Sequence, residues 1–236
     1  AIDLAIDFQG LLKSAVVIMF ARAKQSVGLS SSAARESLAS LFYEKRITPG
    51  SQHIVNRNLE LSNAAGALAP RIAFPIPPFP IPQGRPEGLL SEGPFVLANP
   101  LAGWTSKQWP LEHYAVIAAR LKSRGFQLVL NGAAAVDVPA AISHISGLPG
   151  LIHATRRAHA VIGVDSGPLH LAAALGKPGV AIFGPTDPAR NGPYGGTITT
   201  LRDPSAITSY KRGIAIDPAM RAVTPDDVWD KLEPLL

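Results

Sequence analysis

An apolar segment that leads straight into a polar turn carries the clearest chemical signal in this sequence. Val161–Leu175 has the sequence VIGVDSGPLHLAAAL, in which a strand pattern ends at Asp165-Ser166-Gly167 and an Ala- and Leu-rich helix pattern begins. The first N–H groups of a helix lack partners within it and carry about half a positive charge, so they bind phosphate. Gly167 lets a ligand approach closely, and His170 lies one turn into the helix. The pattern predicts an anion site, although Asp165 and Ser166 could also be simple N-caps.

Two further polar loops each follow a strand pattern. They contain the sequences Gly184-Pro185-Thr186-Asp187 and Thr105-Ser106-Lys107. Ligands of open parallel sheets bind beyond the carboxyl ends of the strands, so this position favours a function. Pro, Asp and Gly also favour plain turns. Lys107 could place a charge on a phosphate, but a single lysine also fits a solvated surface.

Several other chemistries do not fit the sequence. The glycine pattern of a dinucleotide-binding turn and the Gly-Lys-Ser/Thr pattern of a phosphate loop are both absent. Ser166 lacks the flanking glycines of a nucleophile elbow, because Val164 and Pro168 stand in those places. The sequence has no cysteine, and its six histidines form no tight metal-ligand pair. We therefore expect no metal site and no cofactor.

Composition limits the class of protein. With 236 residues and 47% hydrophobic content, the chain can bury the core of one large or two small domains. A net charge of +5 favours an anionic partner, although a basic solvated surface explains it equally well. No aromatic and basic strand motif points to nucleic acid. The longest apolar run, Ala15–Ala21, is too short to span a bilayer, so any membrane contact would be peripheral. No signal peptide is recognisable, and we expect a cytoplasmic protein.

Strand and helix patterns alternate along the chain. Ala1–Asp7 alternates as a strand already under way, which suggests that the natural N-terminus is missing. Helix patterns follow over Phe8–Arg22 and Ser32–Tyr43. Further strands are predicted at 95–98, 126–130, 160–164 and 179–183, with a helix from Leu111 to Gly125 and another that begins with a near capping box at Thr224. This alternation predicts doubly wound parallel sheets.

Residues 70–94 contain eight prolines, a density that excludes helix and favours an extended segment. We therefore divide the chain into a first domain at residues 1–72, a linker at 73–94 and a second domain at 95–236. A ligand is expected in the cleft between the domains.

The three loops together resemble those of the heptosyltransferase family of lipopolysaccharide core synthesis. The likeness rests on SKQWPLEHY and DSGPLHLAAALGKPGVAIFGPTDP, and on IDFQGLLKSA and ARESLASLFY in the first domain, where it is strongest to the members that add the first heptose. It implies an α/β fold of the GT-B type, with two Rossmann-like doubly wound domains facing a cleft and the first domain incomplete. The implied reaction is the inverting transfer of heptose from ADP-heptose to the Kdo/heptose inner core of lipopolysaccharide.

The resemblance also implies a role for each loop. The donor would be bound by Thr105, Lys107, Asp165, Ser166, Gly167, His170, Gly184, Pro185, Thr186 and Asp187. The acceptor, an anionic lipid A bearing Kdo, would meet Gln9, Lys13 and Arg35. Such an enzyme would work at the inner membrane surface of a Gram-negative bacterium.

The family pattern predicts a catalytic base that this sequence lacks. Its aspartate belongs to a Gly-Asp motif on an earlier strand, so we expect the base upstream of Ala1, with Asp7 as the best candidate within the chain. Residues 131–147 are also too few for the expected strand, helix and strand, so an internal segment could be missing there and Asp137 would be a ribose contact. A chain like this would bind nucleotide but transfer little sugar.

Two alternative functions stay open at this point. The chain could belong to another GT-B enzyme that uses UDP or GDP sugars, because a helix N-terminus recognises a diphosphate more surely than a base. It could also be a nucleotide-binding or lipopolysaccharide-binding module without catalytic activity.

Overall fold

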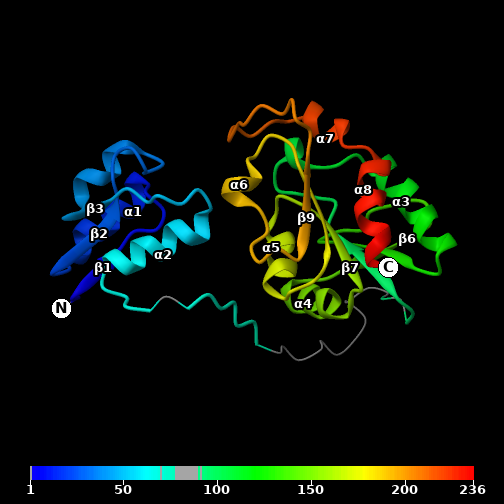
Figure 1. Cartoon of the computed structure of the whole chain (residues 1–236), viewed down its shortest axis with the longest axis horizontal. Coiled ribbons are helices and arrows are strands. Elements are labelled where there is room, and N and C mark those ends of the chain that lie inside the picture. Colours follow the sequence, from blue (N-terminus) through cyan, green and yellow to red (C-terminus); the bar gives the residue numbers. More distant parts are fainter. Residues whose placement is uncertain (1, 70, 78–89, 91) are drawn as a thin grey trace. The chain divides into compact units, whose positions relative to one another are not determined.

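The computed structural model describes all residues except 1, 70, 78–89 and 91, and it divides the chain into two compact units (Figure 1). Unit 1 is Ala1–Ala73 and unit 2 is Phe74–Leu236. Most of the proline-rich linker predicted at 73–94 lies outside the described residues.

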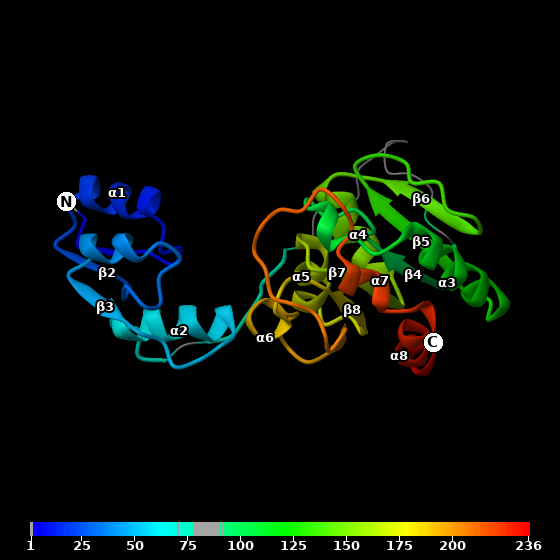
Figure 2. The same ribbon diagram turned by 90° about the horizontal axis from the view of Figure 1, so that it is seen from above.

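Unit 1 is built on a small parallel sheet with strand order β1-β2-β3. Its elements are β1 (Leu4–Ile6), α1 (Leu12–Ala21), β2 (Gln25–Leu29), the 3₁₀ helix η1 (Ser37–Phe42), β3 (Lys45–Ile47) and α2 (Ile54–Ala64). Val27 and Leu29 of β2 pack against Leu61 of α2, whereas Gly28 lies against the ring of Tyr43 on the other face. Figure 2 shows α1 and α2 on opposite sides of these strands. The strand and the helix predicted between residues 1 and 22 are confirmed, with shorter bounds.

The helix predicted over Ser32–Tyr43 is wrong, because the structure has only the 3₁₀ helix η1 at Ser37–Phe42. Serine hydroxyls compete with the helix for local hydrogen bonds, and Ser30 Oγ lies 3.1 Å from Ser32 Oγ and 2.7 Å from Thr48 Oγ1. The Glu36 N–H donates to the Gly10 carbonyl at 3.0 Å instead of to a preceding helical turn.

Unit 2 is built on a six-stranded parallel sheet with strand order β6-β5-β4-β7-β8-β9. The strands are β4 (Phe95–Ala98), β5 (Gln127–Gly132), β6 (Ala141–Ile145), β7 (Ala160–Val164), β8 (Gly179–Phe183) and β9 (Ile198–Arg202). From β4 the chain adds β5 and β6 successively on one side of the sheet, and from β7 it adds β8 and β9 on the other side. The direction of winding therefore changes between β4 and β7. The predicted α/β class with parallel sheets is confirmed.

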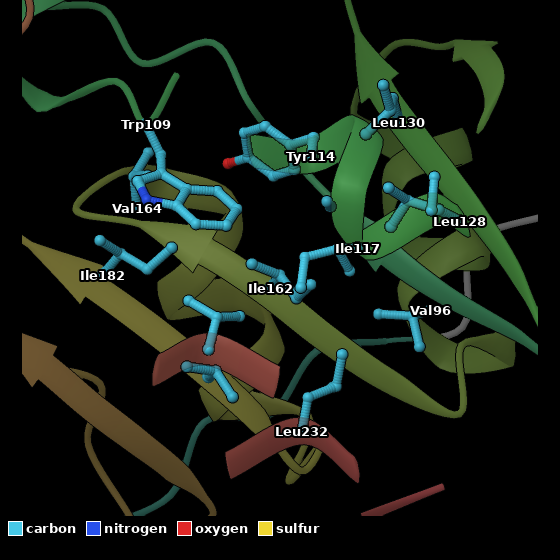
Figure 3. Packing of buried hydrophobic residues seen from close by; sticks show 14 of the residues in the cluster. Val96, Trp109, Tyr114, Ile117, Leu128, Leu130, Ile162, Val164, Ile182 and Leu232 are labelled. Atoms are coloured by element: carbon cyan, nitrogen blue, oxygen red, sulfur yellow. The ribbon is translucent and has the colours of Figure 1, made fainter. Parts of the chain in front are cut away.

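Helices cover both faces of this sheet. The described helices of unit 2 are η3 (Thr105–Lys107), α3 (Leu111–Ser123), α4 (Leu148–Arg157), α5 (Gly167–Ala174), α6 (Pro188–Asn191), α7 (Pro218–Ala222), α8 (Pro225–Leu232) and η4 (Glu233–Leu235). Side chains of α3 and α8 meet one face in a cluster around Tyr114, Ile117, Ile162 and Leu232 (Figure 3). Side chains of α4 and α5 meet the other face around Phe95, Leu97 and Leu169. Because alternate residues of β4 enter the two clusters, the strand is apolar throughout, as expected for a sheet buried on both sides.

The predicted elements of unit 2 lie close to the observed ones. Strands β4, β7 and β8 have the predicted bounds. Helix α3 begins at Leu111, and Gly125, with φ of +79°, follows its end. Helix α8 begins with a capping box in which Thr224 and Asp227 bond each other's backbone N–H.

Strands β5 and β6 are joined by residues 133–140 without a helix. Parallel strands usually need a longer crossover, and this tight connection includes Ala140 at φ of +63°. Asn131 links the two strands, because its Nδ2 lies 2.9 Å from His144 Nδ1 and donates to Ser146 Oγ at 2.7 Å. The stretch at residues 131–147, which is short for a strand, a helix and a strand, thus contains both strands but no helix between them.

Membrane-spanning helices are absent from the described part of the chain, since none there has the length and apolarity that a bilayer requires.

We predict that Gly179→Ala destabilises unit 2 by about 1–3 kcal/mol. A Cβ at residue 179 would lie 2.2 Å from the backbone oxygen of Val161 on the paired strand β7, where neither strand can move freely. Urea denaturation followed by circular dichroism measures the change. Gly103→Ala is the matched control, because a Cβ there meets no atom within 4 Å. Equal midpoints for the two variants would contradict the close contact between β7 and β8.

Candidate functional site

The carboxyl ends of β4 and β7 carry an ion pair at the point where the winding direction changes. After β4 the chain forms η3, which ends with Lys107, and after β7 it continues to Asp165 and α5. Lys107 Nζ donates to Asp165 Oδ2 at 2.6 Å, and the two side chains are only 16% and 10% exposed. Ligands of doubly wound sheets bind at such switch points. The structure therefore joins two of the three loops that the sequence analysis selected.

Asp165 is held in its charged form by its neighbours. Burial by itself raises the pKa of this carboxyl, but the contacts with His170, Lys107 and Thr186 outweigh it and lower the pKa to about 2. His170 Nε2 lies 3.7 Å from Asp165 Oδ1, so this partly exposed histidine faces the carboxylate. Asp165 thereby orients two groups that can each donate to an anion.

Three buried hydroxyls beside this pair have no partner of regular hydrogen-bond geometry among the described residues. They are those of Ser106, Ser166 and Thr186. Ser106 and Thr186 are 5% and 1% exposed. Buried hydroxyls are normally satisfied. Thr186 faces Asp165, so the hydroxyls of Ser106 and Ser166 are the two that point to a ligand.

Helix α5 begins beside these hydroxyls. Ser166 occupies its N-cap position, but its side chain makes no capping hydrogen bond, so a simple N-cap does not account for this serine. A Cβ at Gly167 would meet no atom within 4 Å, which leaves the first turn of α5 open to a ligand. The partial positive charge of this first turn and the Lys107 ammonium lie at the same edge of the sheet.

The loop after β8 contributes one residue to this group and uses the others for packing. Thr186 lies near Asp165 and lowers its pKa. Gly184 lies against Met220, the Pro185 carbonyl accepts from the Ser209 N–H at 2.7 Å, and Asp187 caps α6 by accepting from Ala189 N at 2.9 Å. Donor contacts by Gly184, Pro185 and Asp187 stay predictions, and the observed contacts of these residues hold the loop in place.

Thr105 opens the 3₁₀ turn that carries Lys107, and its carbonyl accepts from Gln108 N at 3.0 Å. Trp104, which precedes it, was not among the residues selected from the sequence. Its ring lies 4.4 Å from Lys107 Nζ, a cation–π contact that fixes the lysine from a second side. In the sequence, the only indication of this contact is that an aromatic residue, Trp104, stands three positions before Lys107.

In unit 1 the predicted acceptor residues surround one turn. Gln9 and Lys13 line a cavity of about 550 Å³ together with Ile6, Asp7, Phe8, Ser14, Val17 and Ile18. Gly10 has φ of +64°, and the backbone of Ala34 and Arg35 lies directly against it. The three residues Gln9, Lys13 and Arg35 therefore come from neighbouring segments.

Asp7, the candidate base within the chain, is buried and fully engaged. Its Oδ1 accepts from the N–H groups of Gln9 and Gly10, and its Oδ2 accepts from the hydroxyls of Ser14 and Tyr43 at 2.7 and 2.6 Å. Burial, followed by the bond to Asp7, raises the pKa of Tyr43 well above its usual range. A carboxylate offers about four acceptor positions, so these bonds use all of them. They indicate that Asp7 holds the turn that carries Gln9.

Comparison with known proteins decides the family of this chain. Residues 1–213 match the family model described as glycosyltransferase family 9 (heptosyltransferase). The chain belongs to this family.

Relatives in glycosyltransferase family 9 are similar over most of the chain. Lipopolysaccharide heptosyltransferase 1 of Pseudomonas aeruginosa is 32% identical over 82% of this chain and 57% of its own length. The enzyme of the same name from Escherichia coli K12 is 31% identical over 86% of this chain and 67% of its own length. The chain thus spans little more than half the length of the Pseudomonas relative.

Solved structures agree with the family. The E. coli heptosyltransferase WaaC with ADP covers 99% of this chain, with a TM-score of 0.71 and 25% identity, and the chain covers 73% of that protein. WaaC with ADP-2-deoxy-2-fluoro heptose gives a TM-score of 0.69 at 26% identity. This likeness confirms the predicted GT-B class of the fold, of which the chain covers part.

We predict that the Asp165 contacts stabilise the folded family 9 chain by about 2 kcal/mol at neutral pH, because its pKa is lowered by about two units. A carboxyl with a lowered pKa stabilises the fold above the pKa of the unfolded chain, near 4. That contribution is lost as the pH falls towards about 2. Urea denaturation of wild type and Asp165→Asn between pH 7 and about 2.5 should give a difference that shrinks with acid.

Asp230→Asn, at an exposed position of α8, is the control and should change little. A difference between wild type and Asp165→Asn that stays constant across this pH range would contradict the assignment.

Proposed function

We propose that this chain provides the donor site and part of the acceptor site of an enzyme that transfers heptose from ADP-heptose to the Kdo/heptose inner core of lipopolysaccharide. The proposal rests on the Lys107–Asp165 ion pair at the switch point of the sheet and on the buried hydroxyls of Ser106 and Ser166 beside it, which have no hydrogen-bond partner among the described residues. Membership of glycosyltransferase family 9 supports it, as do relatives named lipopolysaccharide heptosyltransferase.

The diphosphate of the donor would lie between Lys107 and the first turn of α5. Ser106 and Ser166 would donate their free hydroxyls to phosphate oxygens, and Gly167 would let the phosphate reach the backbone. When the bond between the sugar carbon and the phosphate oxygen breaks, the departing ADP gains negative charge. Fixed donors stabilise such charge most effectively where water is partly excluded, as the burial of Lys107 and Asp165 suggests here. The solved structures of WaaC with ADP and with ADP-2-deoxy-2-fluoro heptose fit this role.

The acceptor would meet unit 1 near Gln9, Lys13 and Arg35. Lipid A phosphates and Kdo carboxylates are anions, and cationic side chains bind them with charge-assisted hydrogen bonds. Gln9 adds a neutral donor at the cavity that it shares with Lys13. A lipid acceptor would place the enzyme in the cytoplasm, peripherally bound to the inner membrane of a Gram-negative bacterium, and the net charge of +5 favours that contact.

Donor binding is proposed to need neither a divalent ion nor another cofactor, because Lys107, the N–H groups at the start of α5 and the hydroxyls of Ser106 and Ser166 can all donate to phosphate oxygens. In the described ranges no group of three metal-ligating side chains comes together. Adding EDTA should leave the dissociation constant of ADP unchanged, and a requirement for Mg²⁺ would contradict this part of the proposal.

Lys107→Ala should weaken ADP binding about 10- to 100-fold, since a charge-assisted hydrogen bond contributes roughly 1.5–3 kcal/mol. Isothermal titration calorimetry with ADP measures the effect. Lys122→Ala is the matched control, because Lys122 is exposed on α3. UDP and GDP should bind more weakly than ADP to the wild type. Equal affinity for the three would favour another sugar nucleotide, and an unchanged ADP affinity in Lys107→Ala would contradict the donor site.

Lys13→Ala should weaken binding of a Kdo-bearing lipid A acceptor about 10-fold and leave ADP affinity as in wild type. The comparison variant is Lys24→Ala, whose lysine is exposed and paired with Asp3 at 2.7 Å. Acceptor binding to immobilised protein provides the measurement. A loss of equal size in both lysine variants would reflect general charge rather than a site at the cavity.

A further inference from the structure

A segment after the last strand of unit 2 connects the two loops of the donor site. We call residues 203–217 the strap; it leaves β9 and leads to α7, in orange in Figure 1. Its Ser209 N–H donates to the Pro185 carbonyl at 2.7 Å, and its Asp217 N–H donates to the Ser106 carbonyl at 3.3 Å. Arg202, at the end of β9, braces the strap by donating to the Ala206 carbonyl and to Thr208 Oγ1. The strap is thus fixed both to the loop after β8 and to the turn that carries Lys107.

The strap brings a second cation to this edge of the sheet. Arg212 Cζ lies 5.6 Å from the centre of the Trp104 ring, which also holds Lys107 Nζ at 4.4 Å. Next to Arg212, Gly213 packs on Ser106 so closely that a Cβ would lie 3.0 Å from the serine Cβ. The indole and the glycine contact together hold Arg212 near the turn that carries Lys107.

The charges at this edge are unevenly balanced. Lys107 is paired with Asp165, so it supplies little net positive charge by itself. In the part of the chain that the structure describes, no carboxylate lies within salt-bridge distance of Arg212. The two acidic residues of the strap bond backbone N–H groups instead, since Asp203 accepts from Ser205 N and Asp217 accepts from Ala219 N. Two cations on one indole repel each other unless an anion lies near both.

We propose that Arg212 is the second cation of the donor diphosphate site, held beside Lys107 by Trp104. The inference rests on the proposed function, since a sugar nucleotide carries a negative charge on each phosphate. Lys107 is a point charge fixed by Asp165, whereas a guanidinium is a planar fork that binds two oxygens of one phosphate. Ser106, whose buried hydroxyl has no partner, lies between the strap and Lys107 and completes the site.

Calorimetric titration of ADP, AMP and adenosine into wild type and Arg212→Ala tests this inference. The variant should weaken ADP about 10-fold, weaken AMP less and leave adenosine unchanged, because only the phosphates meet the guanidinium. Arg221→Ala is the matched control, since Arg221 lies on α7 and faces Glu112 rather than Trp104. Trp104→Leu should cause a similar loss of ADP affinity, and Trp104→Phe should restore most of it, because phenylalanine keeps an aromatic face.

The outcomes separate the inference from the proposed function. If the wild type binds ADP and the Arg212→Ala variant binds it with equal affinity, the inference about Arg212 is wrong while the proposed function stands. An equal loss for ADP and adenosine would also overturn it, because the variant would then have altered the nucleoside site. Wild type that binds no ADP would overturn the proposed function and the inference with it.

Discussion

Strands β4 and β7 are paired in parallel, and this pairing determines where the chemistry of unit 2 can lie. The register that joins Leu97 to Val161 makes both strands end at the same edge of the sheet. Because winding proceeds in opposite directions from these two strands, their carboxyl ends form the switch point of the sheet, where ligands of doubly wound folds bind. Lys107 and Asp165, which lie 58 residues apart in sequence, can meet only through this pairing.

The ion pair has opposite effects on stability and on binding. It offsets the cost of burying two charges, since each side chain would be strongly disfavoured there without the other. It also consumes part of the positive charge that a diphosphate needs. In the proposed donor site, the first turn of α5, the hydroxyls of Ser106 and Ser166 and the cation on the strap would supply what Lys107 lacks. A buried, rigid lysine with supplementary donors is suited to stabilising charge on a leaving group, because little reorganisation is needed during the reaction.

Sequence patterns predicted the core strands well, because β4, β7 and β8 are apolar runs with turns at their ends. They failed at Ser32–Tyr43, where hydrogen bonds between serine and threonine hydroxyls and a bond from Glu36 N–H to the Gly10 carbonyl replace helical bonds. They also placed Lys107, Asp165 and Ser166 in loops that do meet. Patterns could not reveal the Lys107–Asp165 contact, the bond from the Tyr43 hydroxyl to Asp7 or the approach of Arg212 to Trp104, because each joins segments far apart in the chain.

We propose that the donor diphosphate binds beyond the carboxyl ends of β4 and β7, the central strands of unit 2. A crystal structure of the chain with ADP would locate the phosphates. We expect phosphate oxygens within hydrogen-bond distance of Lys107 Nζ, with the backbone N–H of Gly167 and the hydroxyl of Ser166 also in contact. Density for ADP elsewhere, for instance at the outer strands around Asn131 and His144 with Lys107 still bound only to Asp165, would contradict it.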